Sequence, residues 1–228
     1  MQITITEAIW MYVISTFLAV IFDVMMIKFS TGDARTIGLI LLVKSLSLLT
    51  VVSLFFTNPL RLLYTDWIIT TPLTLLTLAL YAMMRKSKHK MLIFGLVVTD
   101  LIMITLGWIS AYAPPATKWW WFGMAILPMF VILYLLYKPL SRIAKQQPAE
   151  INNRYRFLIS FTALTWGVFP LIWVLGHFEN GGLSMESLLT IFNVMNALTK
   201  TTYIYWIFRS LKGISWNREV GGDSPELV

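Results

Sequence analysis

The chain has 228 residues, of which 57% are hydrophobic and only 13% are charged, and its formal net charge is +7. This composition excludes an ordinary soluble domain and indicates a protein that lies in a lipid bilayer. Because the sequence contains no cysteine, structural disulfides and thiolate metal sites are excluded as well.

Seven apolar segments are long enough to cross a bilayer, which takes about 20 residues of helix. In chain order they cover residues 5–28, 35–57, 61–84, 91–113, 119–143, 155–177 and 186–210. Short clusters of turn-forming residues separate them. We therefore predict an all-α membrane protein, a seven-transmembrane helix bundle within residues 1–212. A polar cytoplasmic tail at residues 213–228 is expected to be disordered.

The basic residues indicate the orientation of this bundle. If the N-terminus is outside, only Arg61 and Lys118 of the 18 lysines and arginines fall in outside loops, and only Lys44 and Lys200 fall deep within segments. An excess of positive charge marks the cytoplasmic side. We therefore predict an extracellular N-terminus and a cytoplasmic C-terminus. The positive charge then belongs mostly to the cytoplasmic face, and we expect no nucleic-acid binding.

The first two segments each carry one charged residue at depth. Asp23 and Lys44 lie at nearly equal distances from the turn at residues 30–35. In an antiparallel hairpin they would reach the same depth, roughly two helical turns inside the cytoplasmic face. Because an isolated charge is costly inside a bilayer, we predict an interhelical ion pair between them.

The third and seventh segments contain further polar residues on shared faces. Asp66 and Thr70 are four residues apart, and so are Asn196 and Lys200, so each pair shares a helix face. A lysine at the centre of a spanning helix costs roughly 2.5–3.5 kcal/mol, which points to a functional role. Lys200 could pair with a carboxylate, stay neutral, or form a Schiff base.

Several spaced motifs accompany these residues. The third segment contains Tyr64-x-Asp66-Trp67-x-x-Thr70-Thr71-Pro72, and the sixth contains Trp166-x-x-Phe169-Pro170-x-x-Trp173. The fourth and fifth segments contribute Asp100-x-x-Met103 with Gly107, and Trp121 with Met129 and Tyr134. With Lys200 in the seventh segment, this set resembles, in order and spacing, the microbial rhodopsins, the family of bacteriorhodopsin.

The resemblance implies a retinal protein. It implies all-trans-retinal bound covalently to Lys200 as a Schiff base, with Asp66 as counterion and proton acceptor and with Thr70 and Asn196 beside it. The large rigid faces of three tryptophans would hold the flat conjugated chain. The implied pocket residues are Trp67, Thr71, Thr74, Asp100, Met103, Gly107, Trp121, Phe122, Ala125, Met129, Trp166, Phe169, Pro170 and Trp173.

The resemblance also bears on location and partners. It implies a multi-pass protein of the cell membrane that is not an enzyme and binds no metal. Its partners would be the lipid bilayer and protons or small cations. Related proteins form trimers or pentamers, so we expect a homo-oligomer.

Three departures from the family pattern affect the mechanism. Asn196 stands where the family usually has a second aspartate, so Asp66 is the sole anionic counterion. Leu63 replaces the arginine one turn outside the counterion. Thr77 occupies the position of the proton-donor carboxylate of outward pumps, and a threonine supplies no proton at accessible pH.

Three functions fit this pattern, and the first is preferred. A light-driven proton pump fits the retained aspartate. Its direction is undetermined, because the losses resemble inward-pumping xenorhodopsins and an outward pump without a donor also fits. In either case Asp23 and Lys44 would tune or gate the cytoplasmic proton path, or serve packing alone.

The two alternatives come from other functional classes. A photosensory rhodopsin would also keep the aspartate and lose the donor. A light-gated cation channel would use a polar lining on the seventh segment. The residues that would supply this lining are Asn193, Asn196, Thr199, Thr201 and Thr202.

Overall fold

The computed structural model describes residues 5–29, 36–42, 44–45, 59–84, 89–177 and 183–220, and every regular element in these ranges is a helix. The elements are α1 (Ile5–Phe29), α3 (Pro59–Ala82), α4 (Lys90–Tyr112), α5 (Pro115–Leu135), the single π turn η2 (Leu136–Leu140), α6 (Ser141–Ala144), α7 (Ala149–His177) and α8 (Met185–Val220). Residues 36–42 and 44–45 are also helical. The rest of the predicted second segment, 35–57, lies outside the described residues.

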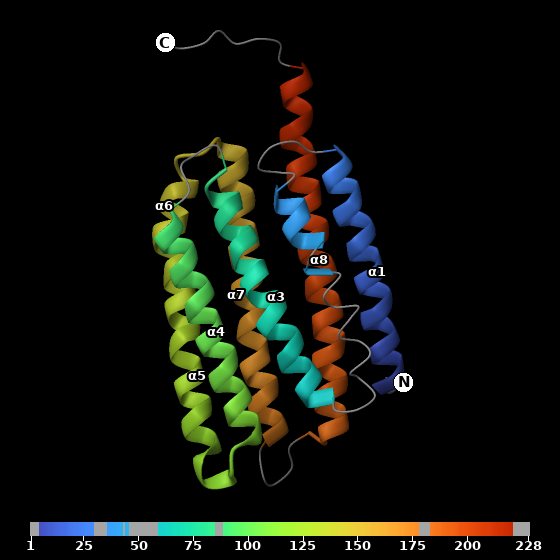
Figure 1. Cartoon of the computed structure of the whole chain (residues 1–228), viewed down its shortest axis with the longest axis vertical. Coiled ribbons are helices and arrows are strands. Elements are labelled where there is room, and N and C mark those ends of the chain that lie inside the picture. The colour runs from blue at the N-terminus through green and yellow to red at the C-terminus, as the bar shows by residue number, and fades with distance from the viewer. Residues whose placement is uncertain are drawn as a thin grey trace.

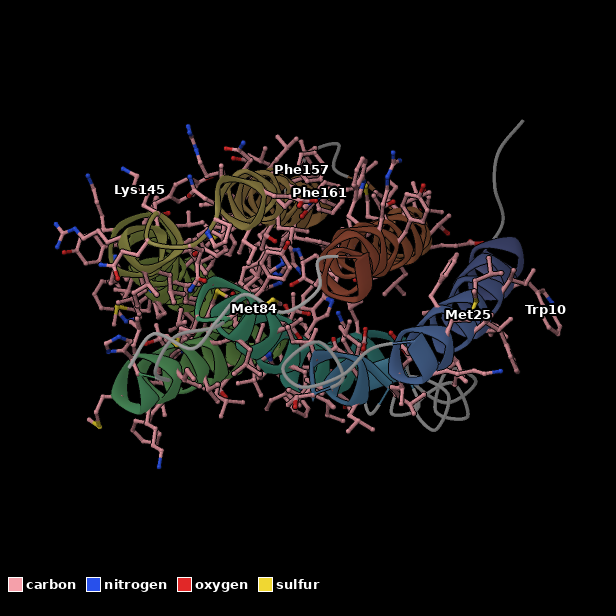
Figure 2. All side chains as sticks on the ribbon, turned by 90° about the horizontal axis from the view of Figure 1, so that it is seen from above. Trp10, Met25, Met84, Lys145, Phe157 and Phe161 are labelled. Atoms are coloured by element: carbon pink, nitrogen blue, oxygen red, sulfur yellow. The ribbon has the colours of Figure 1, made fainter. Side chains whose placement is uncertain are left out.

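The helices run side by side along one axis, and α8 extends past the others towards the C-terminus (Figure 1). Viewed along this axis, α5, α7 and α8 form one row, and α4, α3 and residues 36–45 form the other, with α1 next to α8 (Figure 2). Helix α3 packs against both α4 and α7, while α1 packs against α8. Helix α3 therefore lies at the centre of the bundle.

The outer surface of the bundle is apolar. Four helical stretches in the described residues have the length and composition of membrane spans: Leu63–Ala82, Lys90–Tyr112, Pro115–Ala144 and Ala149–His177. Helix α1 adds a shorter apolar stretch, Thr16–Met25. Large side chains such as Trp10, Phe94 and Leu164 are exposed, and Trp10 points away from the bundle in Figure 2. Such an exterior is suited to hydrocarbon rather than to water.

The end of α8 differs from the prediction. Residues 213–220, which we expected to belong to a disordered tail, are helical, and residues 221–228 lie outside the described residues. A single glycine such as Gly213 costs a helix only about 1 kcal/mol. The described part of α8 reaches Val220.

Among the described residues, two apolar clusters of buried side chains lie at different heights. One surrounds the last turns of α3 and the two residues after it, from Leu75 to Met84, and includes Tyr155 of α7 and Tyr203 of α8. The other contains Leu63, near the beginning of α3, with Trp173 and Phe192. The stretch of α3 between Leu63 and Leu75 lies between these clusters, and the motif residues of the third segment are there.

Candidate functional site

A cavity with about 1070 Å³ of space free of protein atoms, part of it open to the outside, lies in the bundle at the height of this stretch. Its lining comes from α3, α4, α5, α7 and α8 and from Lys44. The residues of the predicted site that line it are Lys44, Trp67, Thr70, Thr71, Thr74, Met103, Gly107, Phe122, Ala125, Met129, Trp166, Phe169, Pro170, Trp173 and Asn196. The structure therefore brings most of the predicted site together around one space.

Aromatic rings hold each other in place around the cavity. The ring of Trp67 makes edge contacts with Phe169 and Phe192, at centroid distances of 5.3 and 5.6 Å. The ring of Trp173 stacks on Phe122 at 4.4 Å. Such contacts fix large flat faces. At Gly107 an added Cβ would lie 3.4 Å from the ring of Tyr64. A larger side chain at this position would therefore press against that ring.

The seventh-segment lysine belongs to the same surface. The side chain of Lys200 lies outside the described residues, but its backbone is part of α8. Asn196, Thr199 and Tyr203 all line the cavity. Residues three or four positions apart share a helix face, so position 200 is on the face of α8 that borders the cavity.

The polar groups lie at the α3–α8 side of this space. Thr70 lines the cavity and is 1% exposed, whereas Asp66, one turn earlier on α3, is 3% exposed and is not among the lining residues. The indole N–H of Trp67 donates to the side-chain oxygen of Asn196 at 3.2 Å, which ties α3 to α8. The Thr70 hydroxyl and the Asn196 side-chain nitrogen are buried and have no hydrogen-bond partner among the described residues.

These observations test whether retinal would fit. A long apolar polyene needs flat hydrophobic walls, which the tryptophans and Phe169 provide. Buried polar atoms normally have a partner, so the two unsatisfied groups on Thr70 and Asn196 suit a ligand that brings one polar end to α8. The residues present therefore fit a conjugated apolar group attached at position 200.

Asp100 lies behind the wall rather than in it. Its carboxyl group is fully buried, and one of its oxygens is 2.7 Å from the hydroxyl of Thr71. The same hydroxyl is 2.8 Å from the carbonyl oxygen of Trp67. The Thr71 hydroxyl donates, and both the Asp100 oxygen and the Trp67 carbonyl oxygen are acceptors within reach of its one proton. The pair joins α4 to α3.

Trp121 is the one predicted pocket residue that the structure places in a different hollow. It lines a groove on α4 and α5 together with Trp108 and Tyr112. Its neighbour Phe122 lines the cavity instead. Consecutive residues of a helix point about 100° apart, so only one of the two can face the bundle interior.

Asp23 and Lys44, which we predicted to form an ion pair, make hydrogen bonds to other residues in the structure. Both side chains are buried, Asp23 completely and Lys44 to 2% exposure. The Lys44 ammonium donates to the hydroxyl of Thr74 at 2.7 Å, and the Asp23 carboxylate accepts from Ser45 at 2.7 Å. Each thus has a hydrogen-bond partner other than the one we predicted, although the two charges are close enough to interact. The direct ion pair between Asp23 and Lys44 stays a prediction.

Sequence reasoning missed part of the lining. It named Tyr64 only as part of a motif and Thr199 only for a channel lining, and it did not name Ile104, Ile126, Phe161, Thr162, Thr165, Phe192 and Tyr203. Helical periodicity would have found several of them: Phe192 is four residues before Asn196, and Phe161 and Thr162 lie one turn before Thr165 and Trp166. The proposed channel lining is described only in part, because the side chains of Asn193 and Thr201 lie outside the described residues.

Comparisons with known proteins agree with this arrangement. Residues 3–213 match the family of bacteriorhodopsin-like proteins. Archaerhodopsin-1 of Halorubrum ezzemoulense is 32% identical over 150 residues, which cover 64% of this chain and 55% of the relative. Sensory rhodopsin-2 of Natronomonas pharaonis is 32% identical over 114 residues, which cover 50% and 46%. The chain thus matches about half the length of these relatives.

Solved structures show the same fold. The cyanorhodopsin N4075R of Tolypothrix sp. NIES-4075 gives a TM-score of 0.83 at 20% identity and covers 95% of this chain and 98% of the other. Exiguobacterium sibiricum rhodopsin gives 0.82 at 18% identity, with 93% and 99% covered. The predicted seven-helix membrane bundle is confirmed. The chain belongs to the bacteriorhodopsin-like family, the microbial rhodopsins, which are multi-pass membrane proteins that carry retinal as a Schiff base on a lysine.

Proposed function

We propose that this protein is a light-driven proton pump in which Lys200 carries retinal and Asp66 is the only carboxylate counterion. The observation that carries the proposal is the burial of Asp66 and Thr70 one turn apart on α3, beside a cavity that the retinal-bearing face of α8 also borders. A buried carboxylate at this place provides both the negative charge for a cation at Lys200 Nζ and an acceptor for its proton.

The chain holds this nitrogen in a defined environment. When bound, retinal supplies a light-driven isomerisation that changes the direction and the proton affinity of Lys200 Nζ. Trp67, Phe169 and Trp173 keep the walls rigid. Asn196 is neutral and accepts a hydrogen bond from Trp67, so Asp66 alone offers a negative charge. Asp66 therefore receives the proton from Lys200 Nζ.

A pump is favoured over a channel by the polar groups of α8. The Thr199 hydroxyl donates to the carbonyl oxygen of Asn196 at 3.3 Å, so it is used within its own helix, as threonines in membrane helices often are. Asn196 in turn is bonded to Trp67. The Thr199 hydroxyl and the Asn196 side-chain oxygen are thus used in bonds within the bundle, which supports a closed wall better than a hydrated path.

The test is light-induced ion movement by the full chain loaded with all-trans-retinal. In unbuffered vesicles, illumination is expected to change the external pH, and a protonophore should abolish the change. Lys200→Ala is the matched control and should give no signal. Photocurrents that reverse with the membrane potential would instead indicate a channel, and absorbance changes with neither signal would indicate a sensor.

A further inference from the structure

Lys44 is an unusual residue for the wall of this cavity. It is 2% exposed, it lines the cavity, and its ammonium donates to the hydroxyl of Thr74 at 2.7 Å. The ammonium also lies 5.1 Å from the ring centre of Tyr203. Of the described residues that line the cavity, Lys44 alone can carry a positive charge. A charge in this position is costly in a membrane, which points to a role in function.

Lys44 and Asp66 lie on opposite sides of position 200 along the bundle axis. Thr74, the partner of Lys44, is eight residues after Asp66 on α3, a distance of ~12 Å along the helix. Tyr203 is three residues after Lys200 on α8 and donates to the carbonyl oxygen of Thr74 at 3.2 Å. The two helices both run towards the end of the bundle where α8 projects. Lys44 therefore lies on that side, and Asp66 lies towards the other end.

We propose that Lys44 is the proton donor of this pump. After Asp66 has taken the proton from Lys200 Nζ, the Lys44 ammonium gives one of its protons to that nitrogen and becomes a neutral amine. The amine then regains a proton from solution at its own end of the bundle. The proposal rests on the proposed proton pump and gives it a direction, from the end of Lys44 to the end of Asp66.

The surroundings of Lys44 suit both of its forms. The ammonium has an acceptor in the Thr74 hydroxyl, and a favourable ring face in Tyr203. The Thr74 hydroxyl now donates to the carbonyl oxygen of Thr70 at 2.8 Å, and by rotating away from that oxygen it can donate to a neutral amine. The titratable groups facing Lys44 include Tyr203 on α8 and Asp23 on α1, and the charge of Asp23 acts on Lys44. On α3 the nearby Thr77 hydroxyl donates to the carbonyl oxygen of Leu73 and is not an acid.

Two variants separate a donated proton from a mere positive charge. Lys44→Met removes both, whereas Lys44→Arg keeps the charge on a guanidinium that does not release its proton. The readout is the rate at which visible absorbance recovers after a flash, which reports when Lys200 Nζ regains its proton. The exposed Lys90→Met at the beginning of α4 is the control and should behave as the unmodified chain does.

The unmodified chain should recover at a rate that is nearly independent of pH around neutrality. In both Lys44 variants recovery should slow at least ~10-fold and fall about tenfold per pH unit, because the proton must then come from solution. Added azide, a small proton carrier, should restore the rate. If Lys44→Arg recovers like the unmodified chain, charge alone is needed, and the donor assignment is wrong. Unchanged recovery in Lys44→Met overturns it equally.

A second measurement needs no variant and reads Lys44 directly. In the unmodified chain with ¹⁵N-lysine, infrared difference spectra should show an ammonium band that is lost as Lys200 Nζ regains its proton and that later returns. Absence of this isotope-sensitive band contradicts the proposal even if a variant fails to fold. The proposed pump is tested separately from the donor role of Lys44. Recovery that depends on Lys44 without any net pH change in vesicles would contradict the pump but keep Lys44 as the proton donor.

Discussion

The charge on Asp66 should determine the colour of the protein. Asp66 is buried one turn from Thr70, and its carboxylate stabilises a positive charge held near Lys200 Nζ. Excitation moves that charge away from the nitrogen, so the carboxylate raises the excitation energy. Asp66→Asn is therefore expected to shift the visible absorption band to the red and to abolish light-driven pH changes, as measured by absorption spectra and in vesicles.

Asp100→Asn is the matched control for this change, since Asp100 is an equally buried carboxyl group on the adjacent helix. Asp100 accepts from Thr71 and is not among the residues that line the cavity, so a neutral amide there should alter the colour far less. An equal red shift in both variants would contradict the counterion role of Asp66. Lys200→Ala should remove the visible band altogether, and a surviving band would refute attachment at position 200.

Single residues also show where sequence reasoning succeeds and fails. The family resemblance implied Trp67, Thr71, Trp166 and Trp173 as pocket residues, and the structure places all four around the cavity. The implied pocket included both Trp121 and Phe122, but adjacent residues of a helix point in different directions. Which of them faced inwards depended on the rotation of α5 against its neighbours, and a single sequence does not contain that rotation.

The link between α3 and α4 makes a prediction at the scale of whole elements. Thr71→Val keeps the shape of the side chain but leaves the buried Asp100 carboxyl without the hydroxyl that now lies 2.7 Å away. The expected loss is about 1–2 kcal/mol of unfolding free energy, since interhelical bonds in membranes are weaker than the full penalty for an unsatisfied group. Thermal unfolding followed by circular dichroism should show a lower midpoint.

The control for this substitution is Thr77→Val on the same helix. The Thr77 hydroxyl donates to the carbonyl oxygen of Leu73 in its own helix, so no second element loses a partner. Its expected effect is within about 0.5 kcal/mol. If both variants lower the midpoint by the same amount, the interhelical bond contributes nothing beyond the local one.

Whole elements were easier to predict than their ends or their rotation. Long apolar runs bounded by turn residues located α3, α4, α5 and α7 well, because the length needed to cross a bilayer is fixed. The polar composition after residue 212 predicts disorder, whereas α8 continues as helix to Val220. For Lys44 the sequence predicted a charge deep in the bundle, and the structure buries the side chain, but counting from a turn does not give the direction of a side chain.

At the scale of the whole molecule, the bundle is chemically asymmetric along its axis. A buried carboxylate, Asp66, lies towards one end of the cavity region, and a buried ammonium, Lys44, lies towards the other. In the proposed cycle these charges fix the order of proton transfers at Lys200 Nζ. The sign of the pH change in vesicles then depends only on which end of the bundle faces outwards.

The orientation can be tested directly because the chain contains no cysteine. Thr117→Cys and Gln146→Cys each introduce one thiol at an exposed position, on opposite ends of the bundle at the beginning of α5 and after α6. With an extracellular N-terminus, a maleimide that does not cross membranes should label Thr117→Cys in intact cells and Gln146→Cys only after permeabilisation. The excess of basic residues at the second end predicts this result.

The labelling result and the flux result constrain each other. If position 117 is outside, proton movement from the end of Lys44 to the end of Asp66 is outward, and illuminated cells should acidify their medium. Alkalinisation of the medium with the same labelling pattern would mean that protons enter Lys200 Nζ from the side of Asp66, and Lys44 would then serve as a barrier rather than as a donor. Reversed labelling would instead mean that the bundle has the opposite orientation in the membrane. The expected sign of the pH change would then be inverted, but the order of the proton transfers would stay the same.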